Sequence, residues 1–159
     1  MLNNFEYKII NNNDYYKDLH FIFQKKLLSS FLKKGNKFYA VKLLNNLKYI
    51  LKKNSKIDPN LLFLIFVLNS LTKFHFIRKK KGGSIKEIPI PITYKRQIGS
   101  IIKILIRLSI SKRTFNPSLN NIALLIFLTN KNRGPFISRK YRAFRKAFDN
   151  KFLLNLIRK

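Results

Sequence analysis

The chain lacks cysteine and tryptophan, and its 159 residues include only six acids and two histidines. Without cysteine it forms neither disulfide bonds nor thiolate metal sites, so redox chemistry says nothing about its compartment. A catalytic or metal site needs several titratable side chains that converge, yet His20 and His75 lie far apart in the sequence. The sequence therefore predicts neither an enzyme nor a metal or cofactor site.

Positive charge is what the chain has in excess. Its 34 lysine and arginine residues give a formal net charge of +28 at pH 7. Solubility needs far less charge, and the repulsion opposes folding unless a polyanion neutralises it. Nucleic acid and an anionic membrane surface both attract clustered lysine and arginine. The chain is still expected to fold, because 46% of its residues are hydrophobic.

The first 17 residues differ from the remainder. They hold Glu6 and Asp14 among asparagines and tyrosines, without an apolar signal core or an arginine-rich transit peptide. We therefore expect a divergent N-terminal segment over 1–17 and a single domain over 18–159. The preference for Lys, Asn, Ile and Phe over Ala, Gly and Pro is typical of AT-rich coding sequences, which organelle genomes often have.

Apolar residues at helical spacing predict six helices. We expect them at about 18–34, 40–51, 59–71, 97–111, 117–132 and 139–152. The pairs Asp58-Pro59 and Asn116-Pro117 are typical helix starts, since a side chain caps the first turn and proline supplies the required φ. Gly35 is expected to end the first helix, and Gly134 is expected to end the fifth.

Two of these helices combine an apolar face with a basic one. The fourth has a core stripe of Ile98, Ile101, Ile102, Leu105 and Leu108, and a second face with Arg96, Ser100, Lys103 and Arg107. The last has an aromatic row of Tyr141, Phe144, Phe148 and Phe152, beside basic first turns. We expect the aromatic row to face the core and the basic residues to face outward.

Between 73 and 93 the apolar period changes from helical to alternating, which predicts two strands joined by a turn. Phe74 and Phe76 belong to the first strand, and Pro89 and Pro91 mark the second as an edge, because proline cannot donate to a ladder. The tip is basic and glycine-rich, with Arg78, Lys79, Lys80, Lys81, Gly82, Gly83 and Ser84. The sequence thus predicts a mainly α domain of about six helices with a protruding two-stranded β-hairpin arm.

Further basic residues follow the tip almost without acids. They are Lys86, Lys95, Arg96, Lys103, Arg107, Lys112, Arg113, Arg133, Arg139, Lys140, Arg142, Arg145 and Lys146. A single surface lysine usually faces water, but a set interrupted only by Glu87 before Asp149 indicates contact with phosphates. We see no zinc finger, basic zipper or recognition-helix pair, so RNA is favoured over DNA. We expect these residues to bind RNA.

Several short motifs occur in a fixed order along the chain. They are Gly82-Gly83-Ser84, Ile88-Pro89-Ile90, Asn132-Arg133-Gly134 and Lys146-Ala147-Phe148. With these motifs in this order, the chain resembles the small-subunit ribosomal protein seven family of bacterial or organelle type. That family has Gly-Gly-Ser, a Val-Pro-Val type strand, Asn-Lys-Gly and Asn-Lys-Ala-Phe at the corresponding places. The resemblance covers about Asp18 to Phe152. The chain departs from the family at residues 1–17, which replace a basic extension, and between Gly134 and Lys146, where it is several residues shorter.

The resemblance implies a structural component of the small ribosomal subunit head, bound to the 3′ major domain of small-subunit rRNA. It also implies that the tip, Arg78 to Ser84, and the basic part of the last helix lie near the exit-site tRNA and the mRNA path. Ribosomal protein eleven and other head proteins would be neighbours, with no cofactor and no membrane contact. Together with the composition, the resemblance favours a mitochondrial ribosome in the matrix, with a plastid as the second possibility.

Two other classes of protein are compatible with the charge. A basic amphipathic membrane-surface protein would also alternate basic and apolar faces, and it would float with liposomes in the absence of RNA. A free RNA or DNA-binding chaperone would bind unrelated duplexes equally well in competition. The glycine-tipped hairpin argues against the membrane alternative.

Overall fold

The computed structural model describes residues 14–72, 74–81, 83–110 and 118–151. These residues form six helices and one two-stranded antiparallel sheet. In chain order the elements are α2 (Asp14–Phe31), α3 (Lys37–Asn54), α4 (Pro59–Ser70), β1 (Phe74–Lys81), β2 (Ser84–Pro91), α5 (Tyr94–Ser109), α6 (Leu119–Asn130) and α7 (Pro135–Asp149). The predicted mainly α fold with a β-hairpin arm is confirmed.

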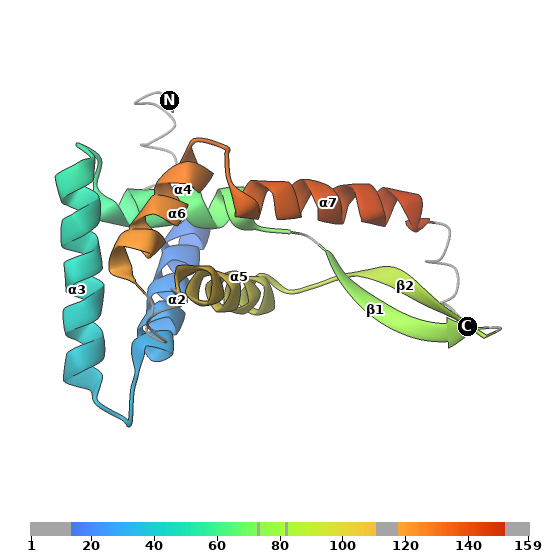
Figure 1. Ribbon diagram of the computed structural model, residues 1–159, viewed down its shortest axis with the longest axis horizontal. Helices are drawn as coiled ribbons and strands as arrows, with labels where there is room; N and C mark the ends of the chain where they lie inside the picture. Colours follow the sequence, from blue (N-terminus) through green and yellow to red (C-terminus); the bar gives the residue numbers. More distant parts are fainter. Residues whose placement is uncertain (1–13, 73, 82, 111–117, 152–159) are drawn as a thin grey trace.

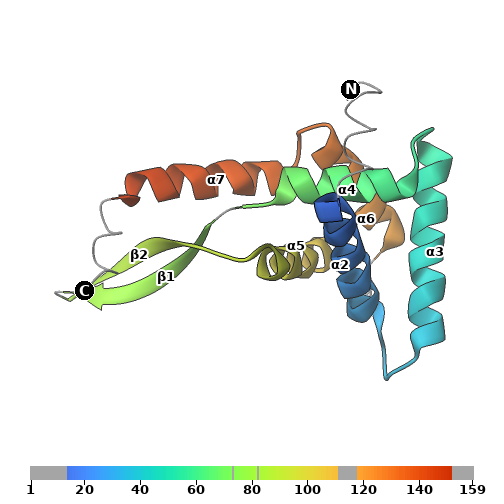
Figure 2. The ribbon, with the colours of Figure 1, turned by 180° about the vertical axis from the view of Figure 1, so that it is seen from behind.

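The helices α2 to α6 form a body from which two elements project. Figures 1 and 2 show α3 at one end of the molecule, and α7 and the two strands extending together from the opposite end. We call β1 and β2 the arm. The arm runs out from α4 and returns into α5, so α5 is the part of the body next to its base.

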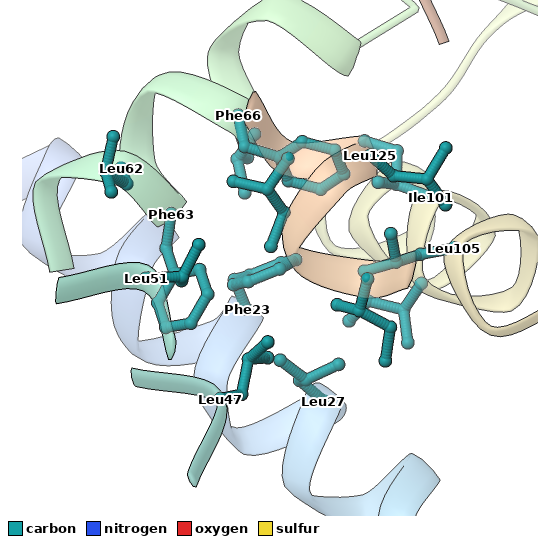
Figure 3. Packing of buried hydrophobic residues seen from close by; sticks show 14 of the residues in the cluster. Phe23, Leu27, Leu47, Leu51, Leu62, Phe63, Phe66, Ile101, Leu105 and Leu125 are labelled. Atoms are coloured by element: carbon teal, nitrogen blue, oxygen red, sulfur yellow. The ribbon is translucent and has the colours of Figure 1, made fainter. Parts of the chain in front are cut away.

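Aromatic rings from three helices fill the centre of the body. The ring of Phe23 in α2 lies 5.5 Å from that of Phe63 and 5.8 Å from that of Phe66, both in α4. Phe66 in turn meets Phe136 of α7 edge to face at 5.1 Å. All four side chains are buried, and leucines such as Leu27 surround them (Figure 3). This cluster attaches α7 to the body, because aromatic pairs of this kind stabilise beyond simple burial.

The helix boundaries follow local chemistry. Pro59 opens α4 as predicted, and the Asp58 carboxylate accepts a hydrogen bond from the backbone N–H of Asn60 at 3.4 Å. The first helix spans Asp14–Phe31 rather than 18–34. It ends early because Lys34 and Gly35 both adopt positive φ, at 50° and 78°, and form the turn into α3.

The predicted burial of the last helix is wrong. Tyr141 is 70% exposed and Phe148 is 68% exposed, because the buried residues of α7 are Phe136 and Ile137, both in its first turn. Beyond that turn it runs alongside the arm (Figure 1), and Phe144 contacts an arm residue instead of the core.

Other expectations differ in smaller ways. Leu108, predicted to be in the core, is 43% exposed near the end of α5, whereas the remainder of its stripe is buried. Gly134 does not end α6, which stops at Asn130, but caps the start of α7 with a φ of 92°. The expected helix start at Asn116-Pro117 and the ring of Phe152 lie outside the described residues.

Replacing Phe66 by alanine tests whether the aromatic cluster supports the fold. The change removes a fully buried ring that joins α2, α4 and α7, so it should lower the free energy of unfolding by about 3–5 kcal/mol in denaturant titration. Phe21→Ala is the matched control, because Phe21 lies on α2 and is 65% exposed. Equal losses in the two variants would show that the cluster has no special role in the core.

Candidate RNA-binding surface

The helix α5 presents a basic stripe on the side opposite its buried residues. Arg96, Lys103 and Arg107 are all exposed, whereas Ile98 and Leu105 are fully buried. We call these three cations the α5 stripe. The predicted division of this helix into a core face and a basic face is therefore confirmed for these residues. Long basic side chains on one helical face can reach successive phosphates of an RNA backbone.

Two hydrogen bonds hold the segment 92–95, which joins β2 of the arm to α5. The Gln97 side chain, which is buried, donates a hydrogen bond from Nε2 to the carbonyl of Ile92 at 2.8 Å, just beyond β2. From α2, the Lys26 ammonium donates to the carbonyl of Lys95 in the first turn of α5. These bonds hold the base of the arm in a set orientation relative to the α5 stripe.

The two faces of the arm differ in chemistry. The antiparallel register pairs Phe74 with Pro91, Arg78 with Glu87, and Lys79 with Lys86. Because side chains alternate along a strand, Lys79 and Lys86 share one face of the arm. Phe74, Phe76 and Glu87 lie on the other face. Both lysines are exposed, and like charges directly across a ribbon destabilise it. A bound phosphate would remove this repulsion.

The other face of the arm contacts α7. Phe74 and Phe144 meet edge to face with their ring centroids 5.4 Å apart, and the Lys146 ammonium lies 5.3 Å from the ring centroid of Phe76. Glu87 forms a salt bridge with Lys146, and its carboxylate also accepts from Arg78 Nε at 3.0 Å. The arm and α7 are therefore joined by an aromatic pair and by one carboxylate between two cations.

Glu87 is the functional residue that the sequence alone did not identify. Its side chain is 22% exposed, and hydrogen bonds from Lys146 and then Arg78 hold the pKa of its carboxyl below the usual range. One feature could have suggested this role, since Glu87 is the sole acid between Asp58 and Asp149 in a strongly basic chain. Such an isolated acid often pairs with the cations around it.

Along α7 the predicted cations are positioned differently from one another. Arg139, Arg142 and Arg145 are exposed, as is Arg133 in the turn before the helix. Lys140 is half-buried, and its ammonium donates to the carbonyl of Asn69 at 3.1 Å, so it helps to fix α7 on the body.

The end of the arm has the turn geometry that its glycines predict. The backbones of Lys81 and Ser84 pair at this end, and Gly83 has the positive φ, 78°, that a tight turn requires. Of the other predicted cations, Lys80 and Lys95 are exposed. The predicted residues Gly82, Lys112 and Arg113 lie outside the described residues.

The titratable groups in the described ranges do not form a metal cluster of three or more ligands. His20 is half-buried, and its Nε2 lies 2.8 Å from Gln24 Nε2. Its pKa is lowered mainly by burial and secondly by the nearby positive charge of Lys48. Because Gln24 also donates to Asn60 at 3.0 Å, this group links α2 to α4. We assign it to the packing of the body.

The family model described as ribosomal protein S7p/S5e matches residues 3–151 of the chain. The chain belongs to this family. The match spans α2 to α7 and the arm, and so includes the α5 stripe and the basic residues of the arm and α7. A comparison with curated proteins finds no match.

Membership of the S7p/S5e family gives the chain its general role. It is a ribosomal protein of the small subunit that binds rRNA, and it is a structural component rather than an enzyme. No helix in the described part of the chain is long and apolar enough to cross a membrane. The family match favours the ribosomal interpretation over a free chaperone or a membrane-surface protein.

Replacing Glu87 by glutamine should loosen the contact between the arm and α7, because it removes the charge that holds two cations. Because the chain contains no cysteine, spin labels can be attached at Ile85→Cys and Tyr141→Cys, both exposed, and their distance distribution measured. We expect a broader distribution in Glu87→Gln and no change in the control, Asp149→Asn, on the same helix.

The same measurement has a defined pH dependence. The folded-state pKa of Glu87 lies below its ordinary value of 4.5, so the contact is fully formed above pH 4.5 and is lost as the pH falls through the lowered value. The distribution should therefore broaden in acid in the parent chain but not in Glu87→Gln. An equally narrow distribution in Glu87→Gln at neutral pH would contradict the proposed role of Glu87.

Proposed function

We propose that this S7-family chain belongs to the head of an organelle small ribosomal subunit, where it binds the 3′ major domain of the rRNA. A mitochondrial ribosome is favoured, and a plastid ribosome is the second candidate. The lysine- and asparagine-rich composition, typical of AT-rich organelle genes, supports this origin. The rRNA-binding domain would comprise residues 18–159. Its first helix, α2, begins slightly before this range, at Asp14.

The proposed rRNA contacts are the α5 stripe, the arm face with Lys79 and Lys86, and the exposed arginines of α7. One observation carries this assignment. Lys79 and Lys86 face each other across the arm, and Glu87, the acid of the arm, already bridges Arg78 and Lys146 on the opposite face. The lysine pair therefore needs an anion from outside, and a phosphate backbone supplies one.

The end of the arm, from Arg78 to Ser84, would lie near the exit-site tRNA and the mRNA path, beside ribosomal protein eleven. Two features of the fold support this placement. The arm projects from the body in the same direction as α7 (Figure 2), and contacts with α7 stiffen it. A projecting, stiffened and basic ribbon can reach a second RNA while the body remains bound to rRNA.

Removing the α5 stripe tests the rRNA-binding surface. In the triple variant Arg96→Ala, Lys103→Ala and Arg107→Ala, the affinity for a 3′ major-domain RNA should fall, and the slope of log affinity against log salt should decrease by about 2 to 3. The matched control exchanges the three cations between lysine and arginine, keeping the charge. Loss of binding in the control alone, or unchanged binding in the alanine variant, would contradict the electrostatic assignment.

A tethered cleavage reagent tests the placement of the arm. Ile85 is 69% exposed on the arm, so Ile85→Cys provides the sole thiol for attaching an iron chelate that cleaves nearby RNA. In assembled small subunits carrying tRNA, we expect cleavage of the exit-site tRNA and of nearby rRNA. The control is Leu124→Cys on α6 of the body, 57% exposed, which should cleave rRNA without the tRNA. Cleavage of the tRNA from neither site would refute the placement.

A further inference from the structure

The helix α3 carries a second surface, separate from the α5 stripe, the arm and α7. Its buried residues, Ala40, Leu44, Leu47 and Leu51, line one side. At the helical spacing i, i+4, i+7, i+11 and i+14, the opposite side presents Phe38, Lys42, Asn45, Tyr49 and Lys52, all exposed. We call these five residues the outer α3 face. It lies at the end of the molecule away from the arm and α7 (Figures 1 and 2).

Two large rings protrude from this face. Phe38 is 80% exposed and Tyr49 is 68% exposed, whereas the aromatic residues of the core are buried. Their helical positions place the two rings ~16 Å apart along the axis, at 1.5 Å per residue. Isolated exposed apolar residues are common, but two aromatic rings in line on one helical face form an ordered surface that a partner can recognise.

The charge of the outer α3 face has a single sign. The 18 residues of α3 include no acid, and on this face Lys42 lies between the two rings and Lys52 follows Tyr49. At its C-terminal end the face continues into a hollow lined by Lys52, Lys53 and Lys56, together with Asp58. The Asp58 carboxylate is already engaged at the start of α4 by the N–H of Asn60. The excess of lysine therefore favours a negatively charged partner for this surface.

Lysine and aromatic residues in alternation favour an RNA partner over a protein. Protein interfaces are depleted in lysine, because burying its ammonium is costly. Unpaired RNA matches both features, since its bases stack on aromatic rings while its phosphates pair with lysines. The Asn45 side chain, between the rings, can donate to and accept from a base edge. A double helix fits less well, because its bases are already stacked.

We propose that the outer α3 face binds an unpaired stretch of rRNA by stacking bases on Phe38 and Tyr49. The inference rests on rRNA binding by the family and goes beyond the proposed head placement, because it adds a second RNA surface of different chemistry. The α5 stripe and the arm recognise phosphates, whereas the outer α3 face recognises unpaired bases. The chain would then hold two separate rRNA segments at opposite ends of its body.

The absence of tryptophan makes stacking directly measurable. Phe38→Trp gives the full chain a single tryptophan on the outer α3 face, and Phe21→Trp places one on α2, at a position that is 65% exposed. The probes are a 12-nucleotide oligouridylate and an RNA duplex with the same number of phosphates. We expect the oligouridylate to quench the fluorescence of Phe38→Trp, and we expect little quenching by the duplex or in Phe21→Trp. Equal quenching at both positions, or by both RNAs, would overturn the proposal.

Affinity provides the second readout. Phe38→Ala with Tyr49→Ala should weaken oligouridylate binding by about 10-fold or more and leave binding of the RNA duplex, which has no unpaired bases, nearly unchanged. Phe21→Ala should affect neither. Unchanged oligouridylate binding in the double variant would refute base stacking at this face.

A photo-crosslinker at position 38 then identifies the occupant in assembled small subunits. An rRNA adduct is expected. A protein adduct in subunits that still incorporate the chain would refute this inference while leaving the proposed function standing, whereas failure of the chain to sediment with small subunits would refute the proposed function itself.

Discussion

Uncompensated positive charge is the constraint on which the rest of the structure depends. With 34 basic residues against six acids, almost every exposed face repels every other. Two unit charges 4 Å apart interact by about 1 kcal/mol in water and by about 4 kcal/mol near a protein surface, so the sum over many pairs is large. The buried cluster of aromatic rings and leucines stabilises the fold against this repulsion, and most of the described cations lie on the surface. A bound RNA would neutralise the remaining positive charge with its phosphates.

This constraint explains why the arm does not stand alone. A two-stranded ribbon is marginally stable in water by itself, and this one also carries the opposed pair Lys79 and Lys86. The long helix α7 supplies what the arm lacks, through the Phe74–Phe144 contact and through the bridge from Glu87 to Lys146. Because Phe136 and Lys140 anchor α7 to α4, the orientation of the arm is set by the core as well as by its own base at Gln97.

Local patterns in the sequence predicted most of the fold. Apolar residues at helical spacing indicated the helices, alternation at Phe74 and Phe76 indicated the arm, and the pair Asp58-Pro59 marked the start of α4. These features depend on residues near one another in the chain, where periodicity is informative. The basic face of α5 was predictable for the same reason.

Long-range contacts were not predictable in this way. The aromatic row of α7 has the spacing of a core-facing helix, yet Phe144 meets Phe74, which lies far away in the sequence. The pattern identifies an aromatic row but shows neither how far it is buried nor which element contacts it. In the same way, the cations of α7 look alike in sequence, but Lys140 bonds to the body and Lys146 to Glu87. The two rings of the outer α3 face could be recognised only once the opposite face was known to be buried.

The salt dependence of binding to a 3′ major-domain rRNA fragment tests most directly whether the excess charge serves to bind RNA, because it counts the phosphates that the cations neutralise. For the intact chain, log affinity should fall linearly with log salt with a slope of about −5 or steeper. A slope shallower than about −1 would show that the charge of +28 is not used to bind RNA phosphates, and it would contradict electrostatic recognition of rRNA by this chain.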